Sequence, residues 1–189
     1  RRRGGQPILE DVSLRPLSYR RFWLAAELLG RVLAPLLGPS RHVGVLLPNV
    51  NSTPVTRLAC WQRDRVPVVF NYTAGAATML VCAHLAQVKH IITSRLFVER
   101  SKIDVAAFTG AGIEVIYLED LGSRISGAAK FLGLARLCLL GPRAHAGHTD
   151  DPAVILFTSG SESLPKAVVL THRNLLANIR QLLVVTDLL

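Results

Sequence analysis

A polar segment between two apolar runs carries the residue types that bind a polyphosphate. It supplies hydroxyl groups, a glycine that leaves backbone N–H groups open, and a lysine shortly afterwards: Thr158, Ser159, Gly160, Ser161 and Lys166. Hydroxyls and amides arranged as a nest surround phosphate oxygens, and an ammonium group adds a compact positive charge. The apolar runs, residues 153–157 and 168–170, have strand length and composition. The segment therefore predicts a phosphate-binding loop that follows a strand.

Three better-known motifs do not fit this segment. A Walker loop needs Gly-Lys-Ser/Thr, whereas Lys166 lies between Pro165 and Ala167. The spacing Ser163-x-x-Lys166 serves catalysis only when both side chains share a helical face, and the proline followed by an apolar run argues against a helix. A nucleophile elbow requires a second glycine that is absent. A serine-rich surface hairpin without a ligand stays open as the alternative.

The residues around this loop resemble a known family. Thr158 to Glu162, Pro165-Lys166 and Val168 to Asn174 resemble the signature of the AMP-forming adenylating enzymes, which include acyl-CoA synthetases, luciferases and peptide-synthetase adenylation domains. The segments 43–49, 65–67, 71–75, 92–95 and 117–121 resemble, more narrowly, the acyl-[acyl-carrier-protein] synthetase part of bifunctional 2-acylglycerophosphoethanolamine acyltransferases. The resemblance runs from about Ser18 to the last residue.

The resemblance implies ATP-dependent activation of a fatty acid to acyl-AMP, followed by transfer to acyl carrier protein in phospholipid acyl remodelling. Coenzyme A is the alternative acceptor. ATP and Mg²⁺ are the implied cofactors. The implied ligand-binding residues are Thr158, Ser159, Gly160, Ser161, Glu162, Lys166 and His172, with Glu162 also a candidate metal ligand. The adenine-binding segment, the ribose-binding aspartate and the C-terminal lysine are expected beyond residue 189, so we assign no catalytic residue and expect no turnover by this chain alone.

Two positions depart from the family loop, which usually has glycine where this chain has Ser163 and Ala167. Glycine in such loops often permits a positive φ or a close approach to a ligand. If Ser163 takes such a conformation, the strain costs on the order of 1 kcal/mol or more. Two alternatives to an active ligase follow: an inactive remnant that has lost ATP binding, and an interaction module for carrier protein or membrane.

Composition narrows the class of protein. Of 189 residues, 50% are hydrophobic and 19% charged, which excludes a wholly disordered tail. The net charge of +9 comes from scattered arginines without aromatic interleaving, so we expect no nucleic-acid partner. Three separated cysteines form no disulfide or zinc pattern, which favours a cytoplasmic location. Attachment to the cytoplasmic face of the inner membrane through flanking domains is a further expectation.

The order of apolar runs predicts an α/β fold of βαβ units, with a mainly parallel sheet covered by helices. Strands are expected near residues 43–47, 66–70, 90–93 and 114–118, with helices near 18–36, 52–63, 75–87, 95–102 and from Thr171 onward. Residues 1–17 are predicted to be a linker from an upstream region, and residues 18–189 a partial AMP-binding N-terminal domain that lacks its C-terminal lobe. Ligands of such sheets bind at the carboxyl ends of the strands.

Three further features of the sequence do not point to a ligand site or a membrane helix. Gly110-Ala-Gly112 lacks the third glycine of a dinucleotide loop and precedes a strand. His145, His148, Asp150 and Asp151 lie in a Gly/Pro-rich loop, where a solvated linker is favoured over a metal site. The apolar run at residues 128–140 predicts a helix that packs into a core or against a domain, in preference to a membrane surface.

Overall fold

The computed structural model describes residues 4–11, 16–141, 147–159 and 165–185. Its main sheet, within those residues, has the strand order β6-β5-β3-β4-β7-β8. The strands are β3 (His42–Val45), β4 (Val66–Val69), β5 (His90–Thr93), β6 (Glu114–Tyr117), β7 (Pro152–Ser159) and β8 (Pro165–Thr171). Five of them run parallel, and β8 returns antiparallel to β7. This confirms the predicted α/β fold with a mainly parallel sheet.

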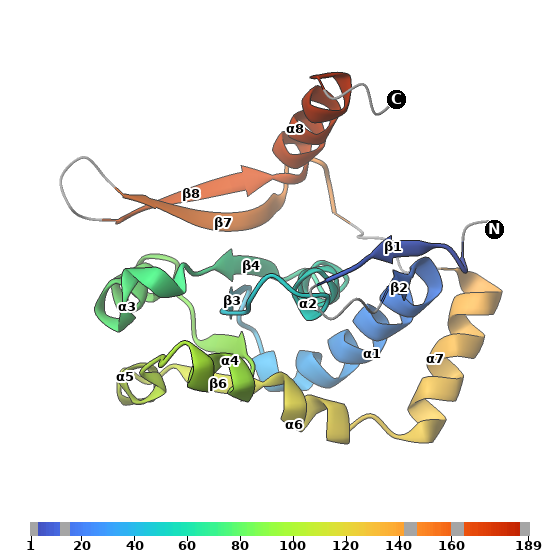
Figure 1. Ribbon diagram of the computed structural model, residues 1–189, viewed down its shortest axis with the longest axis horizontal. Coiled ribbons are helices and arrows are strands. Elements are labelled where there is room, and N and C mark those ends of the chain that lie inside the picture. The colour runs from blue at the N-terminus through green and yellow to red at the C-terminus, as the bar shows by residue number, and fades with distance from the viewer. Residues whose placement is uncertain (1–3, 12–15, 142–146, 160–164, 186–189) are drawn as a thin grey trace.

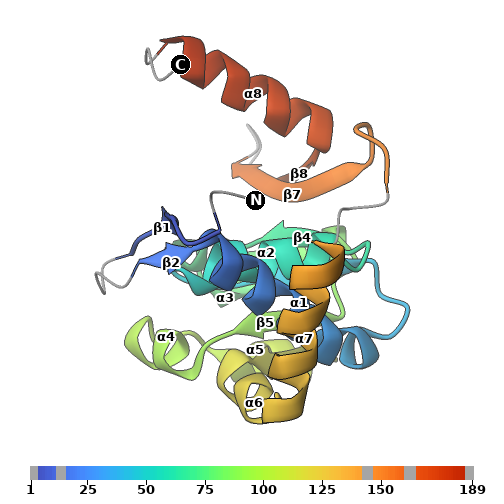
Figure 2. The same ribbon diagram turned by 90° about the vertical axis from the view of Figure 1, so that its right-hand side faces the viewer.

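Helices cover both faces of this sheet (Figures 1 and 2). They are α1 (Tyr19–Leu37), α2 (Ser52–Trp61), α3 (Ala76–Leu85), α4 (Arg95–Arg100), α5 (Val105–Gly110), α6 (Leu118–Ser123), α7 (Gly127–Leu140) and α8 (His172–Val185), with a 3₁₀ turn η1 (Tyr72–Ala74). One core cluster joins α1 and α2 to the sheet through residues such as Leu33, Val43 and Ile92. The other joins α3 and α5 to the opposite face through residues such as Phe108 and Ile91. Alternation of strands and helices thus gives the two-sided core that the sequence predicted.

The segment before α1, predicted to be a linker, contains a short strand. Residues Pro7–Leu9 form strand β1, which pairs antiparallel with β2 (Leu17–Ser18). The Asn51 N–H, at the start of α2, also donates to Asp11 Oδ2 at 2.9 Å. The described part of residues 1–17 is therefore attached to the fold by backbone and side-chain hydrogen bonds, which a short apolar run does not reveal on its own.

Helix α1 begins where its cap predicts. Ser18 has extended backbone, and its hydroxyl accepts a hydrogen bond from Arg21 N at 3.4 Å. The helix ends at Gly38, whose φ of +51° suits glycine. Within α1 the buried Glu27 pairs with Arg31 on the same helix at 3.0 Å and with Arg63 just beyond α2 at 3.4 Å. This ion-pair network fixes α1 against α2.

Helix α7 forms where the sequence predicted a helix, at residues 128–140, and it packs against α1, but it does not pack into the core. Its only buried residue is Gly133, whereas its large apolar side chains are mostly exposed, with Phe131 at 72% and Leu139 at 80%. Helix α8 also exposes its apolar side chains. Periodicity identified both helices but gave no information about what lies against them.

No helix in the described part of the chain has the length and apolar character to cross a membrane.

Candidate functional site

The hairpin of β7 and β8 brings two of the predicted phosphate-binding residues together. In its register Thr158 lies directly opposite Lys166, and Ser159 lies opposite Pro165. Both Thr158 and Lys166 are exposed. Gly160, Ser161, Glu162 and Ser163, which close the hairpin, lie outside the described residues. The hydroxyl and the ammonium therefore stand side by side at the two ends of the predicted loop.

Ala167, which replaces a glycine of the family loop, has no backbone strain. It lies in β8 opposite Phe157, and it is not among the described residues with positive φ. An extended backbone accepts alanine without penalty. Of the two departures from the family loop, only Ser163 therefore leaves the conformational question open.

A cleft of about 480 Å³ lies beside this pair. Its walls come from the carboxyl ends of β4 and β7, the start of β8 and one face of α3. The ring of Phe157 stacks on that of Phe70 with centroids 5.8 Å apart, so the part of the hairpin near its turn packs on the end of β4. Asn71, the next residue, accepts hydrogen bonds through Oδ1 from the N–H and the hydroxyl of Thr73, at 3.1 and 2.8 Å. These contacts give the cleft a defined apolar floor and a fixed polar wall.

His172 lies at the other end of the hairpin. Its neighbour Thr171 pairs with Pro152, six residues along β7 from Thr158. At about 3.3 Å per residue this is roughly 20 Å. The imidazole packs edge-on against Trp61, with ring centroids 5.6 Å apart, and the Trp61 indole N–H donates to Ala153 O at 2.7 Å. The structure thus separates His172 from the Thr158 and Lys166 pair and joins it to the contact between α2 and β7.

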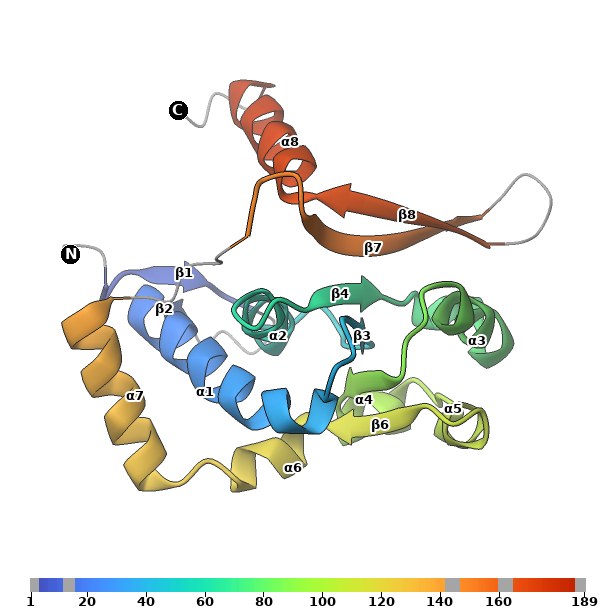
Figure 3. The same cartoon turned by 180° about the vertical axis from the view of Figure 1, so that it is seen from behind.

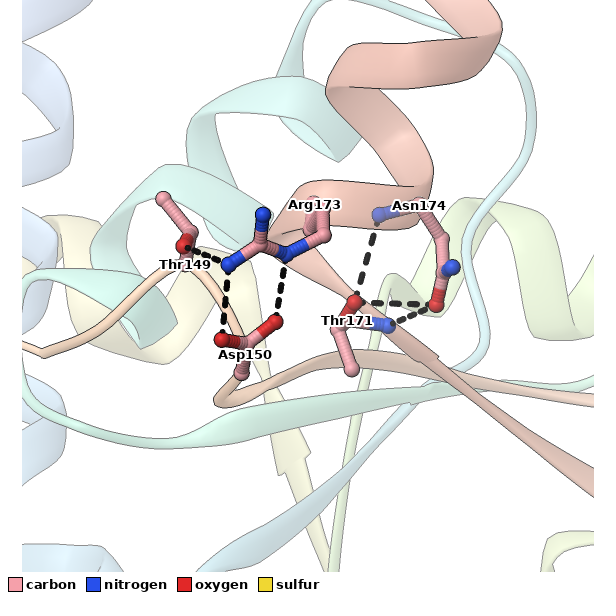
Figure 4. Close-up of polar contacts among 5 residues, drawn as sticks. All are labelled: Thr149, Asp150, Thr171, Arg173 and Asn174. Carbon is pink, nitrogen blue, oxygen red and sulfur yellow. Dashed lines mark hydrogen bonds and ion pairs between the residues drawn. The ribbon is translucent and has the colours of Figure 1, made fainter.

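The turn into α8 is held by a polar cluster that the sequence did not single out (Figure 4). Arg173 Nε lies 2.6 Å from Asp150 Oδ1, and its terminal nitrogen lies 2.8 Å from Oδ2. These hydrogen bonds and the attraction between the charges lower the pKa of Asp150 and raise that of Arg173. Asn174 N–H donates to Thr171 Oγ1 at 3.2 Å, so the threonine hydroxyl caps the start of α8. The cluster fixes where α8 leaves the hairpin.

Among the described residues no group of three His, Cys, Asp or Glu side chains has the arrangement of a metal site. Asp150 accepts from Arg173, and Asp151 Oδ2 accepts from the His148 N–H at 2.7 Å. These aspartates stabilise the turns of the linker. Glu162 and His145 lie outside the described residues.

A second polar cluster occupies the carboxyl ends of β5 and β6. Arg95 lies 2.6 Å from Asp120 and 4.1 Å above the centroid of the Tyr117 ring. Burial alone raises the pKa of Glu119, but hydrogen bonds from Ser94 and from backbone N–H groups outweigh it and leave this pKa low. Both side chains of the pair are exposed, at 58% for Arg95 and 49% for Asp120, as expected of a solvated arginine. Arg95 lies just after β5, at the carboxyl edge of the sheet, where ligands of such sheets bind.

The model of the AMP-binding enzyme family matches residues 1–188. The chain belongs to the AMP-binding enzyme family. Over 33 residues it is 61% identical to the medium-chain fatty-acid–CoA ligase of Escherichia coli K12. This match covers 18% of this chain and 6% of that ligase. Over 193 aligned residues it is 24% identical to the long-chain-fatty-acid–CoA ligase 5 of Rattus norvegicus, which covers 94% of this chain and 27% of that ligase.

Solved structures confirm the fold of this chain. The N-terminal subdomain of Klebsiella oxytoca NpsA has a TM-score of 0.68 at 20% identity, over 91% of this chain and 38% of that one. A benzoate CoA ligase from Burkholderia xenovorans LB400 has a TM-score of 0.67 at 22% identity, over 92% of this chain and 33% of that one. The fold therefore matches the N-terminal domain of adenylate-forming enzymes, of which the chain is a part. The chain spans about a quarter of the length of the long-chain ligases.

Proposed function

We propose that this chain holds the phosphates of ATP during activation of a fatty acid, as part of a longer ligase. One observation carries the proposal: Thr158 and Lys166 face each other across the hairpin at the carboxyl edge of the sheet. The adjacent cleft has room for a ligand. Membership of the AMP-binding family and likeness to fatty-acid–CoA ligases supply the reaction class.

The proposed reaction forms a bond between a carboxylate oxygen of the acid and the α-phosphorus of ATP, and the bond from that phosphorus to the pyrophosphate breaks. A thiol then displaces AMP from the acyl carbon to give a thioester. The carboxylate is already ionised at neutral pH, so the first step needs no general base. Mg²⁺, when bound, neutralises charge on the phosphates.

The described residues suit the task of holding these phosphates. Lys166 contributes a positive charge and Thr158 a hydroxyl donor, and both are exposed next to the cleft. Donors aimed at developing negative charge are the usual means of stabilising such a reaction. By the family resemblance, Ser159, Gly160, Ser161 and Glu162 complete the phosphate contacts. His172 lies too far along the hairpin to join them.

For the acyl acceptor we propose the thiol of acyl carrier protein, on the basis of the segments quoted above. Coenzyme A is an equally supported acceptor, because the similar curated proteins are named as CoA ligases. The two are distinguished in the full-length ligase by mass spectrometry of the thioester formed when both thiols are offered together. A product found only on coenzyme A would contradict the carrier-protein assignment.

Binding of a fluorescent ATP analogue, measured by anisotropy, tests the nucleotide proposal. Replacing Lys166→Ala removes a charge-assisted contact worth about 1.5–3 kcal/mol, so affinity should fall roughly 10- to 160-fold. Lys89→Ala is the matched control, since Lys89 is an exposed lysine that precedes β5 at the opposite, amino-terminal edge of the sheet. Equal affinity of the Lys166 variant and the unmodified chain would refute the assignment.

The same titration separates a working loop from an inactive remnant. If the unmodified chain binds no nucleotide and Ser163→Gly restores binding, the loop has lost its function through that substitution. Ala167→Gly is the internal control, because Ala167 has a normal strand conformation and gains nothing from glycine. Binding by the unmodified chain excludes the remnant.

A further inference from the structure

Helix α7 turns its large apolar side chains away from the protein. Phe131, Leu132, Leu139 and Leu140 are 72, 60, 80 and 75% exposed, and Leu134 is 37% exposed. The residue that α7 buries is Gly133. This is the reverse of a helix on a globular core, where large apolar residues point inward and small or polar ones point outward.

The inward side of α7 is built for close approach to α1. A Cβ atom on Gly133 would lie 3.0 Å from Leu28 Cδ2 and 3.2 Å from Leu24 Cδ1, so the two helices meet closely at this glycine and a side chain there would have to displace these leucines. Ser126 begins the helix with a hydroxyl that accepts from Ala129 N at 3.1 Å. The helix is therefore fixed in orientation, and its apolar face is presented outward by the fold.

Two cations border the outward face. At about 100° per residue, the face runs from Leu134 through Phe131 to Leu132, and Lys130 lies just beyond one border and Arg136 just beyond the other. Helix α7 contains no acidic residue. Long basic side chains at the borders of an apolar face reach toward anionic headgroups while the apolar residues enter the acyl region.

We propose that α7 is a docking face for an anionic lipid surface, on which the helix lies in the plane of the membrane. The charge pattern favours lipid over a protein partner, because the face itself is uniformly apolar and every charge on its borders is positive. Helix α7 lies at the end of the molecule opposite α3 (Figures 1 and 3). Docking there leaves the cleft beside α3 accessible. The inference does not depend on the proposed function, since lipid binding needs no nucleotide.

Cosedimentation with vesicles of equal parts phosphatidylcholine and phosphatidylglycerol tests the docking face. Phe131→Ser with Leu139→Ser should weaken binding at least about tenfold, because each substitution removes an exposed apolar side chain that the lipid would otherwise bury. Ile179→Ser with Leu182→Ser is the matched control on α8, where these residues are 52 and 58% exposed, and it should leave binding unchanged. No sedimentation of the unmodified chain, or equal loss from both variants, overturns the proposal.

The borders of the face are tested separately. Lys130→Gln with Arg136→Gln should weaken binding to the anionic vesicles roughly 30-fold, from about 1 kcal/mol for each cation near the surface, and should abolish most of its dependence on salt. The same variant should bind vesicles of phosphatidylcholine alone as the unmodified chain does. An unchanged affinity for anionic vesicles would contradict the role of the two cations.

A third measurement reports the position of α7 directly. Cys138 is exposed on the helix, whereas Cys60 and Cys82 are buried and burial raises the pKa of both thiols, that of Cys60 to about 12. A water-soluble maleimide therefore modifies Cys138 first, and anionic vesicles should slow this reaction several-fold. An unchanged rate on vesicle-bound chain, or slowing by a second copy of the chain without lipid, would overturn the assignment.

Discussion

A single methyl group added at Gly44 tests how the sheet positions the cleft. A Cβ at this residue of β3 would lie 2.7 Å from Ile91 Cγ1, 2.7 Å from Phe70 Cε2 and 3.2 Å from Val88 Cγ1. All three neighbours are at least nine-tenths buried, so none moves aside freely. Phe70 is the residue that yields most readily, because its ring lies at the cleft, where it stacks on Phe157. We expect Gly44→Ala to disturb both the core and the seat of the hairpin.

The magnitude follows from overpacking of a filled core, which costs about 1–3 kcal/mol. For a chain of this size each kcal/mol lowers Tm by roughly 2–4 °C, so Tm should fall by ~2–12 °C in a thermal melt followed by circular dichroism. Gly110→Ala is the control, since a Cβ there meets nothing within 4 Å, and the last turn of α5 gains helix propensity. An unchanged Tm for Gly44→Ala would refute the packing argument.

Two further predictions concern the attachment of the hairpin. Trp61→Phe removes the donor to Ala153 O and should lower the free energy of unfolding in urea by about 1–3 kcal/mol, because that carbonyl belongs to a fully buried residue; a loss smaller than the error of the urea fit would contradict this. Arg173 lowers the pKa of Asp150, so this pair stabilises the folded state when Asp150 is ionised. Arg173→Gln should therefore be less stable than the unmodified chain at pH 7, and the difference should disappear as pH falls below about 4, where the aspartate becomes protonated. Urea midpoints of the two proteins that still differ at pH 2 would contradict this assignment.

The order of strands and helices could be predicted because each one repeats a local pattern. His90 to Thr93 was predicted as a strand with its observed bounds, since it contains the β-branched residues Ile91, Ile92 and Thr93. Strand β8 is longer than the apolar run 168–170, because pairing along β7 extends it from Pro165 to Thr171. Helix α6 begins at Leu118, which periodicity had assigned to the preceding strand. Non-local pairing and capping decide such boundaries.

The candidate site could be predicted only in part. The types of residue at Thr158 and Lys166 indicated phosphate binding, and the register brings them together. The sequence did not reveal that His172 lies at the far end of the same hairpin. Thr158 and His172 belong to one sequence motif, but β7 and β8 are extended strands that separate the two residues by six residue positions along the hairpin. The sequence also did not reveal the stack of Phe70 on Phe157, which joins residues 87 positions apart.

Strand β8 has a neighbour on one side only within the described sheet. Its unpaired edge offers a row of backbone donors and acceptors, and Val169 within the strand is 51% exposed. Such an edge is a template for adding another extended chain, and a proline at its beginning and one lysine are its main deterrents. Protein concentration is therefore a variable in its own right for this chain, and affinities measured for it acquire meaning only when they are independent of dilution.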